Sequence, residues 1–298
     1  MTGFSKLWAR NCKLFFKDRG AFFSALITPV MLLVLYATFL ANVYRDSFVS
    51  AMPQGFDVSD ALINGTVGAQ LVSSLLAVSC VTVSFCSNLL MVQDKCTGAI
   101  RDITVSPVKR STISLAYFCA SAAATLIVTV SAFAVSLVFL AVKGWYLSFL
   151  DVVLLTGDIV LMTLFGVALS SCINFPLSTN GQASAVGTIV SAGYGFVCGA
   201  YMPLASFPET LQKVLMFLPG TYGTSLIRCD FMRGVFEEMS SSGFPDEVVG
   251  LIRDSVDCNL YFFSHEVSAG AKYAVVAGSL VLFCGLYVLL NCAAKEEK

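Results

Sequence analysis

Long runs of apolar residues dominate the chain, and shorter polar segments separate them. Six runs reach about 20 residues, the length that an α-helix needs to cross about 30 Å of hydrocarbon with every backbone amide bonded internally. The pattern predicts an all-α, polytopic integral membrane protein with six transmembrane helices in one domain, residues 1–298. The predicted spans are residues 22–41, 67–92, 113–142, 152–172, 183–203 and 273–292.

Three segments outside the spans also have a helical pattern. Residues 1–19 place basic side chains on one face and Phe4, Leu7, Trp8 and Phe15 on the other, which predicts an amphipathic interface helix. In the 93–112 loop a helix is expected from about Thr97 to Pro107, where proline stops it. Residues 204–271, between spans five and six, are expected to form a helical outer segment.

Composition and charge agree with a membrane location. With 57% hydrophobic and 12% charged residues, the chain is not a water-soluble globule, and a net charge of −1 gives no basic field for nucleic acid. Eleven basic residues lie in the terminal segments and the 93–112 loop, against two in the short loops opposite. This asymmetry predicts cytoplasmic termini in a cell membrane. With one histidine and no paired catalytic motif, we expect no metal site, no catalytic residue and no cofactor bound by this chain.

Three features of the spans and the outer segment are candidates for function. Asp158 is the one charged residue within the predicted spans, and it is read either as a pathway contact or gate, or as a carboxylate paired with a hydroxyl for packing. The glycine-rich span at 183–203 is read either as close intrachain packing, or as a subunit seam or a pathway-lining helix that must bend. Cys229 and Cys258 are the cysteines of the outer segment, and an oxidising exterior allows them to form a disulfide.

Short motifs in two regions resemble one known family. Residues 94–102 and 105–110 read DKCTGAIRD and VSPVKR, and residues 201–209 and 217–222 read YMPLASFPE and FLPGTY. The first pair is similar to the loop between spans two and three of type-2 ATP-binding-cassette (ABC) exporter permeases. The second pair is similar to that family's proline-marked segment after span five. The basic N-terminal helix, the six spans, this loop and the segment after span five follow one another as in that family, and the resemblance covers nearly the whole chain.

The resemblance implies that the 94–106 segment is a coupling helix seated in a groove of a separate cytosolic ABC ATPase. The chain has no G-x-x-x-x-G-K-[ST] loop, so ATP and Mg are expected in that partner. The residues expected to dock are Asp94, Lys95, Thr97, Gly98, Ile100, Arg101, Asp102, Ile103 and Pro107, with the Ile100 and Ile103 side in the groove. The residues expected along the pathway or the dimer seam are Asp158, Gly193, Tyr194, Gly195, Gly199, Tyr201 and Met202.

These expectations combine into one function with stated alternatives. The chain is predicted to be the permease of an ABC exporter that pairs with a second permease copy or a related permease in the lipid bilayer. Its substrate is expected to be hydrophobic or amphipathic, such as a drug-like molecule, lipid or peptide, because the spans offer few fixed charges. A polysaccharide or glycolipid exporter, a polytopic membrane enzyme, and an ion-coupled carrier without an ATPase are the alternatives.

Overall fold

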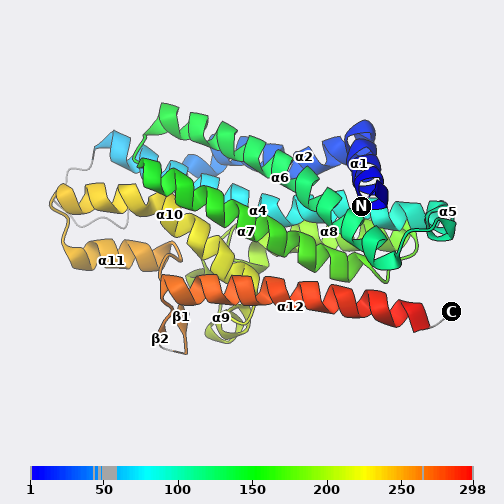
Figure 1. The fold of residues 1–298 in the computed structure, drawn as a ribbon. Helices are drawn as coiled ribbons and strands as arrows, with labels where there is room; N and C mark the ends of the chain where they lie inside the picture. Colours follow the sequence, from blue (N-terminus) through cyan, green and yellow to red (C-terminus); the bar gives the residue numbers. More distant parts are fainter. Residues whose placement is uncertain (1, 43, 46–47, 49–58, 264, 297–298) are drawn as a thin grey trace.

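The computed structural model describes residues 2–42, 44, 45, 48, 59–263 and 265–296, and these residues form a bundle of long helices. Figure 1 shows both ends of the chain and α5 at one end of the bundle, with α11 at the opposite end. The elements in chain order are α1 Thr2–Lys17, α2 Arg19–Leu35, the π-helix η1 Tyr36–Leu40, α4 Asp60–Cys96, α5 Ala99–Val105, α6 Arg110–Lys143, α7 Phe149–Asn174, α8 Asn180–Val197, the 3₁₀ helix η2 Leu204–Ser206, α9 Glu209–Leu215, α10 Pro219–Ser241, α11 Asp246–Ser255, β1 Tyr261–Phe262, β2 His265–Glu266 and α12 Ala269–Glu296.

Helix α4 is the centre of the bundle. It has 37 residues and is therefore roughly 55 Å long. Most of its own side chains are small or apolar, and almost its entire length is buried against α2, α6, α7, α8 and α10. Ser59 caps its start by accepting a hydrogen bond from the Leu62 amide at 3.2 Å. A helix that is apolar on all sides takes the buried position because each of its faces can pack against a neighbour.

Four helices in the described part of the chain are long and apolar enough to cross a membrane: α4, α6, α7 and α12. The predicted spans at 67–92, 113–142, 152–172 and 273–292 lie within them, which makes the chain a membrane protein. A shorter apolar helix, Ala25–Leu35, lies within the predicted first span. The predicted 183–203 span differs from the structure, because α8 ends at Val197 and residues 198–203 form turns.

The 204–271 segment is mainly helical, and part of it packs within the bundle. Helix α10 packs against α4, α7 and α12, and most of its residues from Gly220 to Phe236 are buried. Figure 1 shows it running from the middle of the bundle toward the end where α11 lies. Neighbouring helices provide partners for its polar groups, such as Ser74 on α4 for Arg228. The extracellular placement of the segment stays a prediction.

Candidate functional site

The α5 elbow, residues 97–108, follows the end of α4. Thr97 closes α4 through its backbone amide, which donates to the carbonyl of Gln93 at 2.9 Å. Gly98 then has φ +80°, a left-handed conformation that glycine adopts without steric cost. Helix α5 has seven residues and ends at Val105, two residues before Pro107, as the sequence predicts. Thr97, Gly98 and Pro107 therefore build the elbow.

The apolar side of α5 faces the bundle. Ile100 and Ile103 pack beside a buried cluster formed by Met91, Ile113 and Tyr117. The end of α4 and the start of α6 therefore provide intrachain partners for both isoleucines, and each isoleucine stays partly exposed. That Ile100 and Ile103 enter a partner's groove stays a prediction.

The opposite side of α5 is open. Arg101, Asp102 and Thr104 are exposed, and Val105 retains 87% of its accessible surface. On this face one exposed apolar side chain, Val105, is therefore surrounded by charged and polar side chains. Arrangements of this kind are typical of interface centres, where an apolar core is surrounded by polar residues.

An ion pair anchors the elbow to the N-terminal helix. Asp94, near the end of α4, is buried and accepts hydrogen bonds from Arg10 Nη1 at 2.6 Å and Nη2 at 3.0 Å. The hydroxyl of Tyr117 on α6 donates to the same carboxylate. Hydrogen bonding with Asp94 raises the pKa of Arg10. Asp94 therefore joins α1, α4 and α6, and it does not lie on the open face of α5.

Lys95 makes a second anchor, to the end of α7. Its ammonium group donates to the carbonyl of Phe175, and to that of Leu177 at 3.3 Å, and it lies 5.0 Å from the centre of the Phe175 ring. Carbonyls at a helix C-terminus have no partner within the helix, so a lysine there completes their hydrogen bonding. Of the residues predicted to dock, Asp94 and Lys95 thus face inward, while Arg101 and Asp102 face outward.

A buried arginine organises the opposite half of the bundle. The Arg228 side chain on α10 is 2% exposed and pairs with Asp257 at 3.2 Å. It also donates to Ser74 Oγ at 3.0 Å and to the carbonyls of Gly199 and Val256, each at 2.9 Å. Burial raises the pKa of Asp257 despite the nearby arginine. Arg228 therefore ties α10 to α4, to the turn after α8 and to the segment after α11.

Asp158 has a hydroxyl partner. Tyr273 on α12 donates to its Oδ1 at 2.6 Å, while its Oδ2 has no hydrogen-bond partner among the described residues. Asp230 on α10 interacts electrostatically with Asp158, and burial raises the pKa of Asp230. The structure thus supplies the packing partner that the sequence left as one of two alternatives. A second carboxylate, Asp230, therefore acts on Asp158, and the two alternatives, a pathway contact and a packing pair, both stay predictions.

The glycines of α8 and of the turn that follows it fall into two sets. A side chain at Gly195 meets the ring of Tyr201, and Gly199 has φ +72° beside Leu204 and Asp257, so both serve packing within the chain. Gly187 and Gly193 have nothing within 4 Å of an added Cβ among the described atoms. Of the residues predicted for the seam, Gly193 faces open space. Tyr194, Tyr201 and Met202 are half-buried.

Cys229 and Cys258 are neighbours as free thiols. Cys229 Sγ lies 3.1 Å from the backbone carbonyl oxygen of Cys258, and Lys272 Nζ donates to the same carbonyl at 2.5 Å. Hydrogen bonding with Cys258, together with the charge of Lys272, lowers the pKa of Cys229 to about 6. The fold therefore brings together the two cysteines that the sequence paired.

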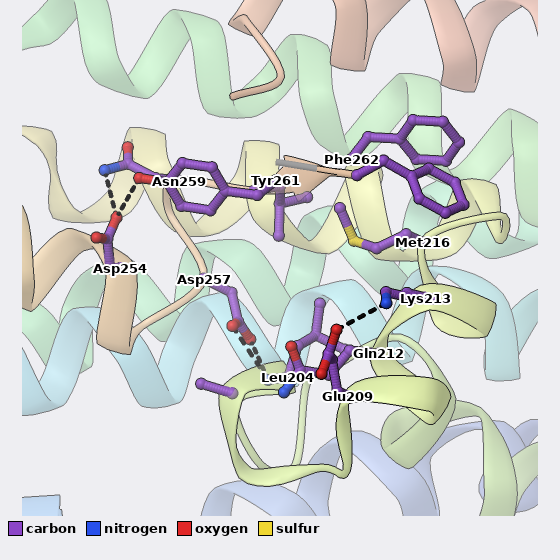
Figure 2. Close-up of a pocket in the computed structure, with 13 residues that line it drawn as sticks. Leu204, Glu209, Gln212, Lys213, Met216, Asp254, Asp257, Asn259, Tyr261 and Phe262 are labelled. Carbon is purple, nitrogen blue, oxygen red and sulfur yellow. Dashed lines mark hydrogen bonds and ion pairs between the residues drawn. The ribbon is translucent and has the colours of Figure 1, made fainter. Parts of the chain in front are cut away.

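A pocket of about 420 Å³ lies between α9, η2 and the strands, and Figure 2 shows its lining. Its polar groups bond to one another. Lys213 pairs with Glu209 at 2.7 Å, Asp254 accepts from Asn259 and Tyr261, and Asp257 accepts from the Leu204 amide. Among the described residues, most polar groups that line the pocket are thus bonded to one another.

Sequence reasoning missed the Arg10 and Asp94 pair and the Arg228 and Asp257 pair. The sequence places Arg10 on the basic face of the amphipathic helix, and it gave no sign that this side chain reaches Asp94. Arg228 carried a usable signal, since it interrupts the apolar stretch around Leu226, Ile227 and Phe231. No comparable signal identified Asp257 as its partner, because the two lie 29 residues apart along the chain.

Comparison with known families gives one match. The family model described as ABC-2 type transporter matches residues 2–231, which is more than three quarters of the chain. No curated protein matches this chain significantly.

Proposed function

The chain belongs to the ABC-2 type transporter family, the permease component of ABC transporters, and we propose that it exports a hydrophobic or amphipathic substrate across the cell membrane. A separate cytosolic ABC ATPase supplies ATP hydrolysis. The observation that carries this proposal is the α5 elbow, which offers Val105 and its charged neighbours on one side and is fastened to the bundle on the other.

The contacts behind α5 suggest how force passes from the ATPase into the membrane. A push on the open face of α5 reaches α1 and α6 through the buried Asp94 carboxylate, which Arg10 and Tyr117 both contact. It reaches the end of α7 through Lys95. Because these links are short and charged, the elbow and the helix ends move together, and rigid-body movement of helices opens the route for substrate.

The proposed assembly has six spans per chain, cytoplasmic termini and a second permease copy or related permease. The open face of α8 is the proposed seam, because Gly187, Thr188 and Gly193 combine small size and polarity where a lipid-facing helix normally presents bulky apolar groups. Gly187→Leu and Gly193→Leu should reduce co-purification of differently tagged copies. Gly195→Leu is the matched control, since it clashes with Tyr201 inside the chain and should lower thermal stability instead.

The decisive experiment measures binding of a co-expressed stand-alone ABC ATPase to the purified permease. Burying one valine stabilises a complex by about 1.5–3 kcal/mol, so Val105→Asp should weaken binding by roughly tenfold or more and abolish substrate-stimulated ATP hydrolysis. Val142→Asp is the matched control, because Val142 is 80% exposed near the opposite end of the bundle. It should bind the ATPase normally.

Ile103→Asp provides the contrast. Because Ile103 packs beside Met91 and Ile113, this change should lower the thermal midpoint of the permease itself. If Val105→Asp retains full binding while Ile103→Asp loses it at an unchanged midpoint, the open face of α5 is not the docking surface. If no elbow variant alters binding or hydrolysis, the elbow does not couple the chain to an ATPase.

A further inference from the structure

The pocket of Figure 2 lies in the 204–271 segment and has the size of a small-molecule site. Its volume of about 420 Å³ falls within the roughly 300–1,000 Å³ that such sites enclose. Tyr261 and Phe262 lie on one side of the pocket, and Leu204, Asp257 and Glu209 lie on the other (Figure 2). An aromatic wall therefore stands opposite carboxylate side chains.

Carboxylates outnumber cations in the pocket. Among the described lining residues, the charged side chains are Glu209, Asp254, Asp257 and Lys213. Lys213 pairs with Glu209 at 2.7 Å, and Asp257 pairs at 3.2 Å with the buried Arg228 of α10. These ion pairs balance Glu209 and Asp257, so the net negative charge of the pocket is centred on Asp254.

Asp254 is held beside an aromatic ring by neutral donors. Its Oδ1 accepts hydrogen bonds from Asn259 Nδ2 at 2.8 Å and from the Tyr261 hydroxyl at 3.1 Å. Because both donors are neutral, these bonds do not cancel the charge of the carboxylate. The bond to Asp254 also raises the pKa of the Tyr261 hydroxyl, which therefore stays protonated and continues to donate at neutral pH.

Ring contacts hold the aromatic wall in place. Phe262 packs edge-on against Phe263 and Phe217, with ring centroids 4.9 and 5.4 Å apart. Tyr261 and Phe263 nevertheless stay 46% and 58% exposed. The face of an aromatic ring carries partial negative charge and attracts a cation placed over it. The wall and Asp254 therefore favour the same kind of ligand.

The ligand that fits these observations is a cation without hydrogen-bond donors. Most polar groups of the pocket already bond to one another, whereas a primary ammonium group has three donors to satisfy. In the part of the chain that the structure describes, no group of three or more His, Cys, Asp or Glu side chains could hold a metal ion. A quaternary ammonium group needs no such partners, because it interacts through its charge and its apolar methyl surface.

We propose that this pocket binds a quaternary ammonium group, with the cation between the aromatic wall of Tyr261 and Phe262 and the Asp254 carboxylate. Leu204 and Met216 provide apolar contacts for its alkyl groups. Free organic cations and choline lipids both carry such a group. The negative pocket favours the free cation, because a lipid headgroup also carries an anionic phosphate.

Proton NMR with matched ligands tests the proposal. Choline and its neutral carbon analogue, 3,3-dimethylbutanol, each give one sharp signal from their equivalent methyl groups. Each is titrated with the purified full chain in a maltoside detergent, and broadening of that signal beyond the broadening by empty micelles measures binding. We expect choline to bind at least about fivefold more tightly than the neutral analogue. Ethanolamine, which has a primary ammonium group, should compete with choline only weakly.

Variants of the pocket identify the groups responsible. Asp254→Asn keeps an oxygen that accepts from Tyr261 and should weaken choline binding by about threefold to fivefold, with no effect on the neutral analogue. Tyr261→Leu should also weaken choline binding, whereas Tyr261→Phe keeps the ring and should retain most of it. Asp246→Asn, at the start of α11, is the matched control, because Asp246 is not among the lining residues. An unchanged thermal midpoint shows that each variant is folded.

Three results would overturn the proposal: equal binding of choline and its neutral analogue, choline binding that neither Asp254→Asn nor Tyr261→Leu weakens, or ethanolamine that binds as tightly as choline. Choline that produces no broadening also overturns it. Glycerophosphocholine distinguishes the two sources of the group. Weaker binding than choline supports a free organic cation, and tighter binding overturns that choice in favour of a lipid headgroup. No ATPase is present in this assay, so its outcome is independent of the proposed export function.

Discussion

Removing Arg228 should destabilise the permease more than removing any exposed cation. Arg228→Met preserves most of the side chain's length but removes the charge that faces Asp257. It also leaves Ser74 Oγ and the carbonyls of Gly199 and Val256 without their donor. Breaking a buried ion pair by removing one partner costs about 3–5 kcal/mol, because the remaining charge stays buried and uncompensated.

That energy corresponds to a large thermal shift. At about 2–4 °C per kcal/mol for a protein of this size range, the midpoint should fall by roughly 6–20 °C. A thiol-reactive fluorescent dye provides the assay, because buried cysteines such as Cys80 and Cys198 become reactive on unfolding. Lys213→Met is the control, since Lys213 pairs with Glu209 on the surface, and its midpoint should stay unchanged.

A second substitution tests the cause of the destabilisation. Asp257 has φ +57°, and asparagine tolerates this conformation while removing the charge. Adding Asp257→Asn to Arg228→Met should therefore recover part of the lost stability, because no buried charge remains unpaired. The reasoning is refuted if Arg228→Met leaves the midpoint unchanged, or if the two substitutions simply add.

Two further predictions concern the ends of the bundle. Arg10→Asp should slow coupled ATP hydrolysis and should lower the free energy of unfolding by at most about 1.5–3 kcal/mol, since a third of the Arg10 side chain stays in solvent. Adding Asp94→Arg should restore both properties, and a double variant as defective as the single one contradicts the proposed link. Oxidised glutathione should convert Cys229 and Cys258 to a disulfide, with each thiol losing one hydrogen, because the pKa of Cys229 of about 6 gives a thiolate at neutral pH. Peptide mass spectrometry without reducing agent detects the joined peptides, and continued alkylation of both thiols contradicts the pairing.

The positions of the long helices followed from the sequence. A segment in lipid must satisfy its own backbone hydrogen bonds, so an apolar run of sufficient length has few alternatives to a helix. Four of the predicted runs lie within helices that are long and apolar enough to span. The elbow also follows from single residues. Glycine can adopt the positive φ found at Gly98, and proline cannot continue a helix at Pro107.

In the α8 region, the length of the apolar run did not predict where the helix ends. The predicted span continued to residue 203 because the residues after Val197 are mostly apolar or small. In the structure the chain turns there, and the Gly199 carbonyl accepts a hydrogen bond from the buried Arg228. A hydropathy profile does not predict this contact, since the arginine lies 29 residues further along the chain.

The sequence by itself therefore determined the class of protein, most of the spanning helices and the elbow, because these depend on local apolar length and on the geometry of single residues. Only the tertiary structure decided which side of α5 is open. A helix of seven residues has fewer than two full turns, so Ile100, Ile103 and Val105 do not define one face by periodicity alone. The apolar surface of α6 and the buried Asp94 carboxylate orient α5, and they leave Val105 in solvent.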